Sequence, residues 1–301
     1  MKYVQRFRIS EGKPNYWGFE IVNRFSSEDV SVVVCTRNSI SGIEACLESL
    51  RESNIGELIV VDAHSTDGTA DIAFRIADKF FQDPGLGLGN ARNIGISQTT
   101  KSLILNWGSD NVLPIGQLDR MIHYLVSGEY HGVSAQTLIK GDDYLSKGLN
   151  TWRSGRFFEG AREIIGTPTL FYGEILRKHP YDSTRVFSDD SELCERWRKE
   201  FNAQFAISDA VIEEVGKTSW NEIQTRARMY GISDKEVFDQ GLKSGWNLSR
   251  IVKSLFHPLN ADLITPIRKS KLEESIPAIP FLLAFTASRY AAWTAAAVKR
   301  D

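Results

Sequence analysis

The sequence lacks several features, and each absence excludes a class of protein. It has no basic excess, because 36 Lys and Arg face 38 Asp and Glu in 301 residues, for a formal net charge of −2. A dedicated nucleic-acid binder usually carries a strong basic excess, so we expect no nucleic-acid partner. Nine prolines and 23 glycines are ordinary numbers, which excludes disordered and fibrous classes.

Cysteine is also scarce. The three cysteines, Cys35, Cys46 and Cys194, are odd in number and contain no C-x-x-C pair. This favours a reduced, cytoplasmic protein over a disulfide scaffold or a zinc site. Residues 1–25 contain no apolar run of signal-peptide length, and nothing in residues 1–275 is apolar for long enough to span a bilayer.

What is present from residue 30 onward is an alternation of strands and helices. Apolar runs at 31–35, 58–61 and 103–105, with a shorter one at 80–81, are each joined to the next by a helical pattern. This alternation predicts an α/β fold with a doubly wound, mostly parallel, Rossmann-like sheet. Ligands of such sheets bind beyond the carboxyl ends of the strands, so Asp62 and Asp110 should face one crevice.

The second half is less regular. We expect strands near 132–135 and 167–172, a charged helix over 189–201, a helix over 220–230 that ends at Gly231, and helices over 234–242 and 248–256. Arg153, Arg156 and Arg162 are expected in a solvated basic loop, or in a mobile loop near an acceptor. The chain therefore divides into an N-terminal extension (1–29), an α/β domain (30–232) and a C-terminal helical region (233–301).

Two segments could bind a nucleotide. The carboxylate of Asp62 is placed to accept hydrogen bonds from a ribose or a base, whereas Asp67 is better explained as a cap of the helix near residue 69. Glycines at 87–89 open a helix that carries Arg92, which could hold a diphosphate; a turn with a surface arginine is the alternative. This segment precedes the fourth strand, so it is not a dinucleotide fingerprint.

Two acidic segments could carry the chemistry. Asp110, with Asn111 beside it, supplies a hard oxygen ligand for Mg²⁺ or Mn²⁺, which need few protein ligands when phosphates and water fill the rest; an ordinary polar turn is the alternative. Asp189, Asp190 and Glu192 place three carboxylates within four residues. Helix capping accounts for one of them. A second could act as general base toward an acceptor hydroxyl.

Taken together, these segments resemble the family 2 glycosyltransferases. The resemblance rests on five motifs in family order over roughly residues 30–232: VSVVVCTRN at 30–38, LIVVDAHSTDGT at 58–69, GLGNARNIG at 87–95, LILNWGSDN at 103–111, and SDDSEL at 188–193 followed by Arg196. It implies a GT-A fold, a nucleotide-diphospho-sugar transferase domain with the C-terminal helical region as an extension.

The resemblance also implies residue roles. Thr36, Arg37 and Asp62 would lie at the nucleotide, and Asp110 would hold a divalent metal (Mn²⁺ or Mg²⁺) that bridges the donor diphosphate. Asp190 would be the general base of a single inverting displacement. The metal stabilises the leaving diphosphate, so no second carboxylic acid is needed to protonate it.

Three departures from the family pattern bear on the site. Ala63 and His64 replace the second Asp and the Gly of the nucleotide loop. Gly108 replaces the first Asp of the D-x-D segment, so that Asp110 is left with possible support from Asn111. Asp189 replaces the Glu before the base. His64 and Asp189 are also candidates for supporting roles.

The segment 276–298 is long enough to span a bilayer, but it contains Arg289 and two prolines. Basic residues flank it, and Tyr290 and Trp293 suit an interface. We expect it to lie on the cytoplasmic face of a membrane. Docking on the protein's own core or on a second subunit is the alternative.

The sequence thus predicts a metal-dependent glycosyltransferase that moves one sugar from a UDP- or GDP-sugar to a glycan or lipid-linked acceptor. The acceptor could be a lipid-linked saccharide, a polyprenyl phosphate or a surface polysaccharide. A sugar-1-phosphate nucleotidyltransferase is disfavoured, because residues 35–39 do not form its glycine-rich loop. A non-catalytic scaffold that binds sugar nucleotides or glycans stays open, because the first aspartate of D-x-D and the second aspartate of the nucleotide loop are missing.

Overall fold

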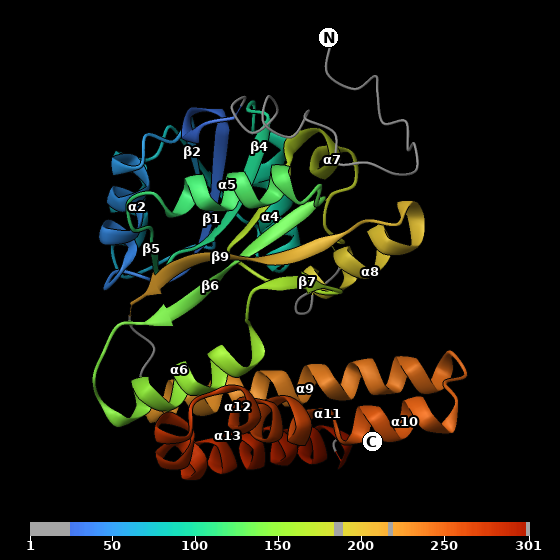
Figure 1. Ribbon diagram of the computed structural model, residues 1–301. Coiled ribbons are helices and arrows are strands. Elements are labelled where there is room, and N and C mark those ends of the chain that lie inside the picture. The colour runs from blue at the N-terminus through green and yellow to red at the C-terminus, as the bar shows by residue number, and fades with distance from the viewer. Residues whose placement is uncertain (1–24, 184–188, 216–218, 299–301) are drawn as a thin grey trace.

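The computed structural model describes residues 25–183, 189–215 and 219–298. A central sheet has helices on both faces, and a separate layer of helices lies beneath it in the view of Figure 1. Most of the expected N-terminal extension, 1–29, lies outside the described residues, as does Ser188 at the start of the acidic segment.

The first half of the sheet is parallel, in the order β3-β2-β1-β4. Its strands are β1 (Val30–Thr36), β2 (Glu57–Asp62), β3 (Lys79–Gln82) and β4 (Leu103–Gly108), and a short turn, η1 (Ser27–Asp29), leads into β1. The helices between the strands are α2 (Ile43–Glu52), α3 (Thr69–Ile76) and α4 (Leu88–Ser97). All six residues of β2 are buried, as expected of an apolar strand covered on both faces.

The second half of the sheet is mixed. β8 (Thr169–Tyr172) is antiparallel to β4 and to β6 (Gly132–Ile139), and β6 is parallel to β9 (Phe205–Glu214). Two short strands, β5 (Asn111–Val112) and β7 (Gly160–Arg162), run antiparallel to β9. The helices here are α5 (Gln117–Ser127), α7 (Gly173–Lys178) and α8 (Asp189–Phe201). The α/β fold class is confirmed, with the parallel pairs confined to β1–β4 and to β6 with β9.

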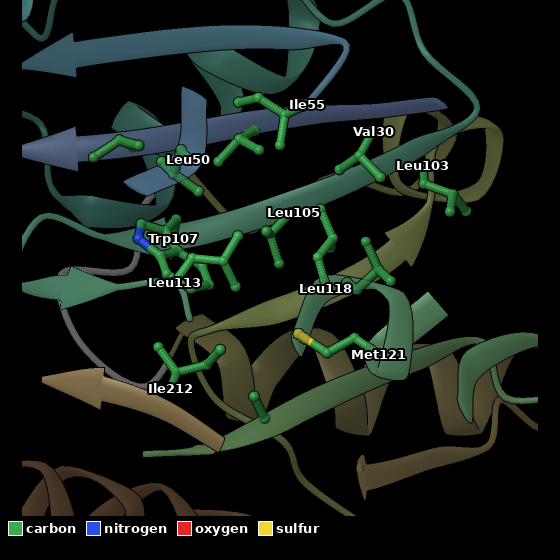
Figure 2. Packing of buried hydrophobic residues seen from close by; sticks show 14 of the residues in the cluster. Val30, Leu50, Ile55, Leu103, Leu105, Trp107, Leu113, Leu118, Met121 and Ile212 are labelled. Carbon is green, nitrogen blue, oxygen red and sulfur yellow. The ribbon is translucent and has the colours of Figure 1, made fainter. Parts of the chain in front are cut away.

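The hydrophobic core lies on both faces of the sheet because alternate strand residues point to opposite sides. In β1, Val32 and Val34 contribute to a cluster with α2 and α5, whereas Val33 contributes to a cluster on the other face with α7 and α8. Figure 2 shows part of the first cluster, in which Leu105 of β4 lies near Leu118 of α5 and Trp107 of β4 lies near Leu113. Each buried aliphatic side chain contributes about 1.5–3 kcal/mol relative to an exposed one.

The helices below the sheet form what we call the helical layer. It consists of α6 (Tyr144–Arg156), α9 (Trp220–Lys243), α10 (Leu248–Leu255), α11 (His257–Leu259), η2 (Asn260–Ile264), α12 (Thr265–Lys269) and α13 (Leu272–Val298). Phe281, Leu282 and Phe285 of α13 are buried against Leu149 and Trp152 of α6. One face of the segment 276–298 therefore docks on the protein itself, which was the alternative to membrane contact.

The expected end of a helix at Gly231 is wrong, because α9 continues through it to Lys243. A Cβ at Gly231 would lie 2.1 Å from the carbonyl oxygen of Arg289. Glycine is present because the α9 and α13 backbones touch here, not because the helix stops. The boundary expected between residues 232 and 233 falls inside this helix.

A buried ion cluster joins the helices of the layer. Arg289 of α13 donates to both carboxylate oxygens of Asp234 on α9, at 2.6 and 2.8 Å, and to Asp262 at 2.7 Å. Arg156 of α6 and the Trp152 indole both donate to the other oxygen of Asp262, at 2.8 and 2.9 Å. The charge inside the apolar segment 276–298 is thus paired within the protein. Within the described residues, no helix is apolar over enough length to cross a membrane.

The expectation of a solvated loop around Arg153 and Arg156 is wrong. Both residues lie on α6, and Arg153 is buried. The hydrophobic pattern of the sequence does not predict this helix, because its buried face includes small and polar residues, among them Ser146 and Thr151.

Candidate functional site

A cavity of about 250 Å³ opens beyond the carboxyl ends of β1 and β4, where the doubly wound pattern predicts a ligand site. Its lining combines residues from both halves of the sheet: Val33, Cys35, Leu88, Arg92, Trp107, Gly108, Ser109, Asp110, Asn111, Thr167 and Glu214. Burial raises the pKa of the Cys35 thiol to about 12, so this thiol stays protonated and is a poor nucleophile.

The loop after β2 is held by the carboxylate of Asp62. This carboxylate is fully buried and accepts hydrogen bonds from the Ser65 amide, at 2.9 Å, and the Ser65 hydroxyl, at 2.5 Å. Thr36 pairs with Asp62 in the β1–β2 register, and its hydroxyl oxygen is buried without a hydrogen-bond partner in the described part of the chain. The Asp62 carboxylate and the unsatisfied Thr36 hydroxyl therefore belong to paired residues at this edge of the sheet.

Neighbouring side chains fix the same loop. Asp67 accepts from the amide and hydroxyl of Thr69 at the start of α3, in agreement with its expected structural role. His64 has a φ of 54°, in the left-handed region. This is strained for a residue with a Cβ and is the conformation that the family's glycine would adopt freely. Arg37 is exposed on the preceding loop.

The Ser109–Asn111 segment is held by the loop after β1 and by the end of β9. The hydroxyls of Ser109 and Ser39 lie 2.9 Å apart, which joins this loop to the loop after β1. The Val215 amide donates to the Asp110 carbonyl at 2.8 Å, and Asn111 pairs with Glu214 in the β5–β9 ladder. The carboxylate of Asp110 is therefore presented on a loop whose backbone is fixed by β9.

Asn111 lines this cavity and has an unsatisfied side-chain oxygen. Its side chain is 3% exposed, and its Oδ1 has no hydrogen-bond partner in the described residues. A buried acceptor without a partner is unfavourable unless a ligand or ion satisfies it. Carboxylate and amide oxygens are the ligands that Mg²⁺ and Mn²⁺ prefer, so Asp110 and Asn111 together fit a divalent cation. No group of three or more His, Cys, Asp or Glu side chains in the described ranges could enclose a metal alone.

Gly108 is matched to this arrangement. A Cβ at residue 108 would lie 2.8 Å from Asp110 Oδ1 and 3.0 Å from Asn111 Nδ2. An aspartate at this position would therefore require the Asp110 side chain to turn away. The absence of a side chain at residue 108 thus leaves room for the Asp110 carboxylate where it lies.

Arg92 joins the cavity to the acidic start of α8. One of its nitrogens donates to Asp189 at 2.6 Å and to Asp190 at 2.9 Å, and the other donates to the Thr167 hydroxyl. The guanidinium also lies 4.9 Å from the centre of the Tyr181 ring. Burial alone would lower the pKa of Arg92, but the charges of Asp190 and Asp189 raise it, so the side chain stays cationic.

The two aspartates have different surroundings. The side chain of Asp189 is 5% exposed, and that of Asp190 is 22% exposed. Burial raises the pKa of Asp189, and the charge of Asp190 adds to this rise against the effect of Arg92. Asp190 Oδ1 also accepts from the Tyr181 hydroxyl at 3.2 Å. Arg92 and Tyr181 thus both donate to the same oxygen of Asp190, Oδ1.

Glu214 is a cavity residue that the sequence reasoning did not identify. Its side chain is 8% exposed and accepts from Arg153 of α6 at 2.5 Å and from Arg226 of α9 at 2.9 Å. Burial alone would raise the pKa of Glu214, but the two arginines hold it below its ordinary value. In the sequence, the signal for this residue was that Glu213 and Glu214 directly follow the mostly apolar segment 205–212. Through Glu214 the helical layer contacts the cavity.

The structure thus divides the expected site residues into two groups. Arg92, Asp110 and Asn111 line the cavity, and Arg92 attaches Asp189 and Asp190 to it. The second group lies at the ends of β1 and β2 and in the loops that follow them, and is absent from the described lining: Thr36, Arg37, Asp62 and His64. The Ser39–Ser109 contact links the loops of the two groups.

Comparison with known proteins agrees with the resemblance seen in the sequence. Residues 31–180 match the profile of glycosyl transferase family 2. A cholesterol galactosyltransferase of Borreliella burgdorferi is 27% identical over 99 residues, which are 31% of this chain and 27% of that protein. A PGL/p-HBAD biosynthesis glycosyltransferase of Mycobacterium bovis is 33% identical over 91 residues, 28% of this chain and 36% of that protein. The matches therefore span only about a third of these relatives.

Solved structures extend the likeness of the fold to nearly the whole chain. The mannosyltransferase PcManGT from Pyrobaculum calidifontis, in complex with GDP-Man and Mn²⁺, has a TM-score of 0.63 at 18% identity and covers 92% of this chain and 89% of its own. TarS 1–349 of S. aureus in complex with UDP-GlcNAc has a TM-score of 0.52 at 16% identity, covering 90% and 91%. The GT-A fold with a C-terminal helical region is confirmed.

Proposed function

Residues 31–180 belong to glycosyl transferase family 2, and on this premise we propose that the protein moves one sugar from a nucleotide-diphospho-sugar to an acceptor hydroxyl or phosphate. The observation that carries the proposal is the placement of Asp190. Arg92 lines the cavity together with Asp110 and Asn111, and it binds the Asp190 carboxylate at 2.9 Å. A donor diphosphate would lie at Asp110 and Asn111, and the acceptor nucleophile would approach Asp190.

On the donor side, we propose that Asp62, Thr36 and Arg37 contact the base and ribose. The buried acceptor of Asp62 and the unsatisfied Thr36 hydroxyl support this role. UDP and GDP are the favoured nucleotides, because proteins of similar fold were solved with GDP-Man and UDP-GlcNAc. Arg92 was expected at the diphosphate, but its three hydrogen bonds within the protein favour a role in positioning Asp190.

We propose Asp110 and Asn111 as the protein ligands of a divalent cation. When bound there, Mn²⁺ or Mg²⁺ would supply Lewis-acid stabilisation of the leaving diphosphate. The unsatisfied Asn111 Oδ1 supports this assignment, as does the Mn²⁺ bound with GDP-Man by PcManGT.

For a hydroxyl acceptor, Asp190 would act as the general base. The acceptor oxygen forms a bond to the anomeric carbon, the bond from that carbon to the diphosphate oxygen breaks, and the hydroxyl proton passes to Asp190. We propose Oδ2 as the receiving oxygen, because Arg92 and Tyr181 both donate to Oδ1. Attack opposite the leaving group inverts the anomeric configuration. A phosphate acceptor carries no proton to remove, so the requirement for Asp190 distinguishes the two acceptors.

The acceptor and the location are also proposals. A lipid-linked saccharide, a polyprenyl phosphate or a surface polysaccharide would fit an enzyme on the cytoplasmic face of a membrane. The three unpaired cysteines support a reduced compartment. Contact of 276–298 with the membrane is restricted to the outer side of α13, because the inner side packs on α6 and α9.

The competing function is a non-catalytic scaffold that binds sugar nucleotides. Gly108 and Ala63, in place of two family aspartates, favour it. Release of free nucleotide diphosphate from a UDP- or GDP-sugar in the presence of acceptor separates the two, because a scaffold releases none.

A thermal-shift screen with UDP, GDP, CMP and dTDP, each with and without Mn²⁺, tests the donor site. A ligand that binds only the folded state raises the melting temperature. We expect one nucleotide diphosphate to raise it, and to do so only with Mn²⁺. If no nucleotide shifts the transition, the proposed donor site is wrong.

A further inference from the structure

The outer side of the helical layer exposes an apolar stripe that faces away from the protein. Helix α10 has no buried residue, although its apolar residues recur at helical spacing. Leu248 is 76% exposed, Val252 and Leu255 are each 43% exposed, and Phe256, directly after the helix, is 58% exposed. An amphipathic surface helix normally turns its apolar face to the core, whereas α10 turns it to solvent.

This orientation is fixed by contacts at both ends of α10. Before the helix, the Trp246 ring lies over Gly241, where a Cβ would be 2.2 Å from the ring, and Asn247 accepts from the Arg250 amide at 2.9 Å as the N-cap. After the helix, the Tyr290 hydroxyl of α13 donates to the Leu255 carbonyl at 2.7 Å. The exposed stripe is therefore held in place by well-defined neighbours.

Helix α13 continues the apolar surface. In Figure 1, α10 and α13 both lie beyond α9 as seen from the sheet, and the Tyr290–Leu255 hydrogen bond places them side by side. Four large apolar side chains of α13 are exposed by 51% or more: Leu272, Ile276, Leu283 and Val298. Together with the α10 stripe they form a surface that we call the apolar outer face.

The segment that carries α10 and α13 is mainly basic. Residues 243–298 contain seven Lys and Arg against three Asp and Glu, whereas the whole chain has 36 against 38. One residue of each sign, Arg289 and Asp262, is buried in the ion cluster. The exposed basic residues are Lys243, Arg250, Lys253, Arg268, Lys269 and Lys271. The two exposed acids, Glu273 and Glu274, lie in the first turn of α13.

We infer that the apolar outer face binds the surface of an anionic lipid bilayer, with α10 as its main insertion element. An apolar stripe bordered by lysine and arginine is complementary to acyl chains beneath acidic headgroups. The sequence placed this contact in 276–298, but α13 buries Phe281, Phe285 and Trp293 inside the protein. Helix α10, in contrast, has no buried residue.

Vesicle sedimentation of the full chain tests the inference. The vesicles contain phosphatidylcholine alone or phosphatidylcholine with phosphatidylglycerol, and no sugar donor is added. We expect sedimentation with the anionic vesicles, weaker sedimentation with the neutral ones, and a decrease with rising salt. Because the readout needs no sugar transfer, its failure is distinguishable from failure of the proposed function.

Two sets of substitutions locate the binding surface. The triple variant Leu248→Gln, Val252→Gln, Leu255→Gln should lower the partition coefficient at least about tenfold. The matched control Phe74→Gln, Ile115→Gln, Ile164→Gln changes three exposed apolar residues elsewhere and should bind as the parent does. The variant Arg250→Gln, Lys253→Gln should lose about tenfold on anionic vesicles only. Unchanged melting temperatures establish that these variants fold.

Three results would overturn the inference. The first is that the parent protein does not sediment with anionic vesicles. The second is that the triple variant sediments as well as the parent does. The third is that the parent binds no vesicles and forms a dimer in size-exclusion chromatography that the triple variant abolishes, which would make the outer face an interface between two copies.

Discussion

At the residue scale, the most informative side chain is Arg92, which binds two carboxylates with different exposures. Asp189 is the more buried partner, and Asp190 is the more exposed one. One guanidinium between two carboxylates leaves one negative charge in excess. In the proposed function, that charge belongs to the general base Asp190.

We expect Asp190→Asn to lower kcat for transfer to a hydroxyl acceptor by about 10²–10⁴-fold, because the amide cannot accept the proton. Donor affinity, measured by thermal shift, should be unchanged. Glu195→Gln on the same helix is the control, because Glu195 is exposed and pairs only with Lys199 among the described contacts. Full activity of Asp190→Asn with a hydroxyl acceptor would remove Asp190 from the base role.

We expect Asp110→Ala to weaken Mn²⁺-dependent donor binding at least about tenfold, because one of two proposed oxygen ligands is lost. Titration of the nucleotide diphosphate with and without chelator measures this effect. Asp119→Ala removes an exposed acid from α5 and serves as the control. Equal donor affinity of Asp110→Ala and the parent would contradict the metal assignment.

At the element scale, the parallel half of the sheet is tied together by one carboxylate. Glu57 of β2 accepts from the Ser31 hydroxyl of β1 and from Lys79 of β3, both at 2.6 Å, and from the Thr100 amide at 3.0 Å. Burial alone would raise the pKa of Glu57, but the hydrogen bonds from Lys79 and Ser31 hold it below its ordinary value of 4.5.

This lowered pKa gives a pH-dependent prediction. The stabilisation by the Glu57 carboxylate is fully present above pH 4.5 and is lost as the pH falls through the folded-state pKa. At pH 7, Glu57→Gln should lower the free energy of unfolding by about 1–2 kcal/mol, and the difference should shrink in more acidic solution. Urea unfolding at several pH values measures it, with the exposed Glu48→Gln as control. A difference independent of pH would show that the carboxylate charge has no part in it.

The two halves of the sheet differ in how far the sequence predicts them. Strands β1, β2 and β4 are continuous apolar runs with helical patterns between them, so local periodicity identifies them. Strand β9 is interrupted by Ser208 and Asp209, and its pairing with β6 and β5 depends on residues far away in the chain. Local pattern predicted Asp62 and Asp110 at one crevice, and of these two Asp110 lines the cavity. It missed Glu214, which non-local pairing brings there.

At the scale of the whole molecule, the helical layer and the sheet are joined by buried charges. Glu214 of β9 binds Arg153 and Arg226, and Arg289 binds Asp234 and Asp262 within the layer. The sequence indicated only that Arg289 is costly in an apolar helix. Its partners lie 55 and 27 residues away, so no local pattern could name them.

We expect Arg289→Met to lower the free energy of unfolding by about 3–5 kcal/mol, because it removes the arginine that pairs with Asp234 and one of the two arginines that pair with the buried Asp262. Chemical denaturation of the full chain measures the loss. Arg268→Gln, at an exposed residue of α12, should have little effect. A loss below about 1 kcal/mol would mean that the ion cluster contributes little to holding α13.

The pairing of β5 with β9 also affects the order in which the crevice can be assembled during synthesis. Asn111 pairs with Glu214, about a hundred residues later in the chain, whereas the pairs among β1 to β4 can all form once residue 108 has emerged. A nascent chain stopped at residue 180 would contain the matched family segment without the strand that fixes Asp110, and without Asp190. The cavity is thus completed late, after the parallel half of the sheet has had time to fold.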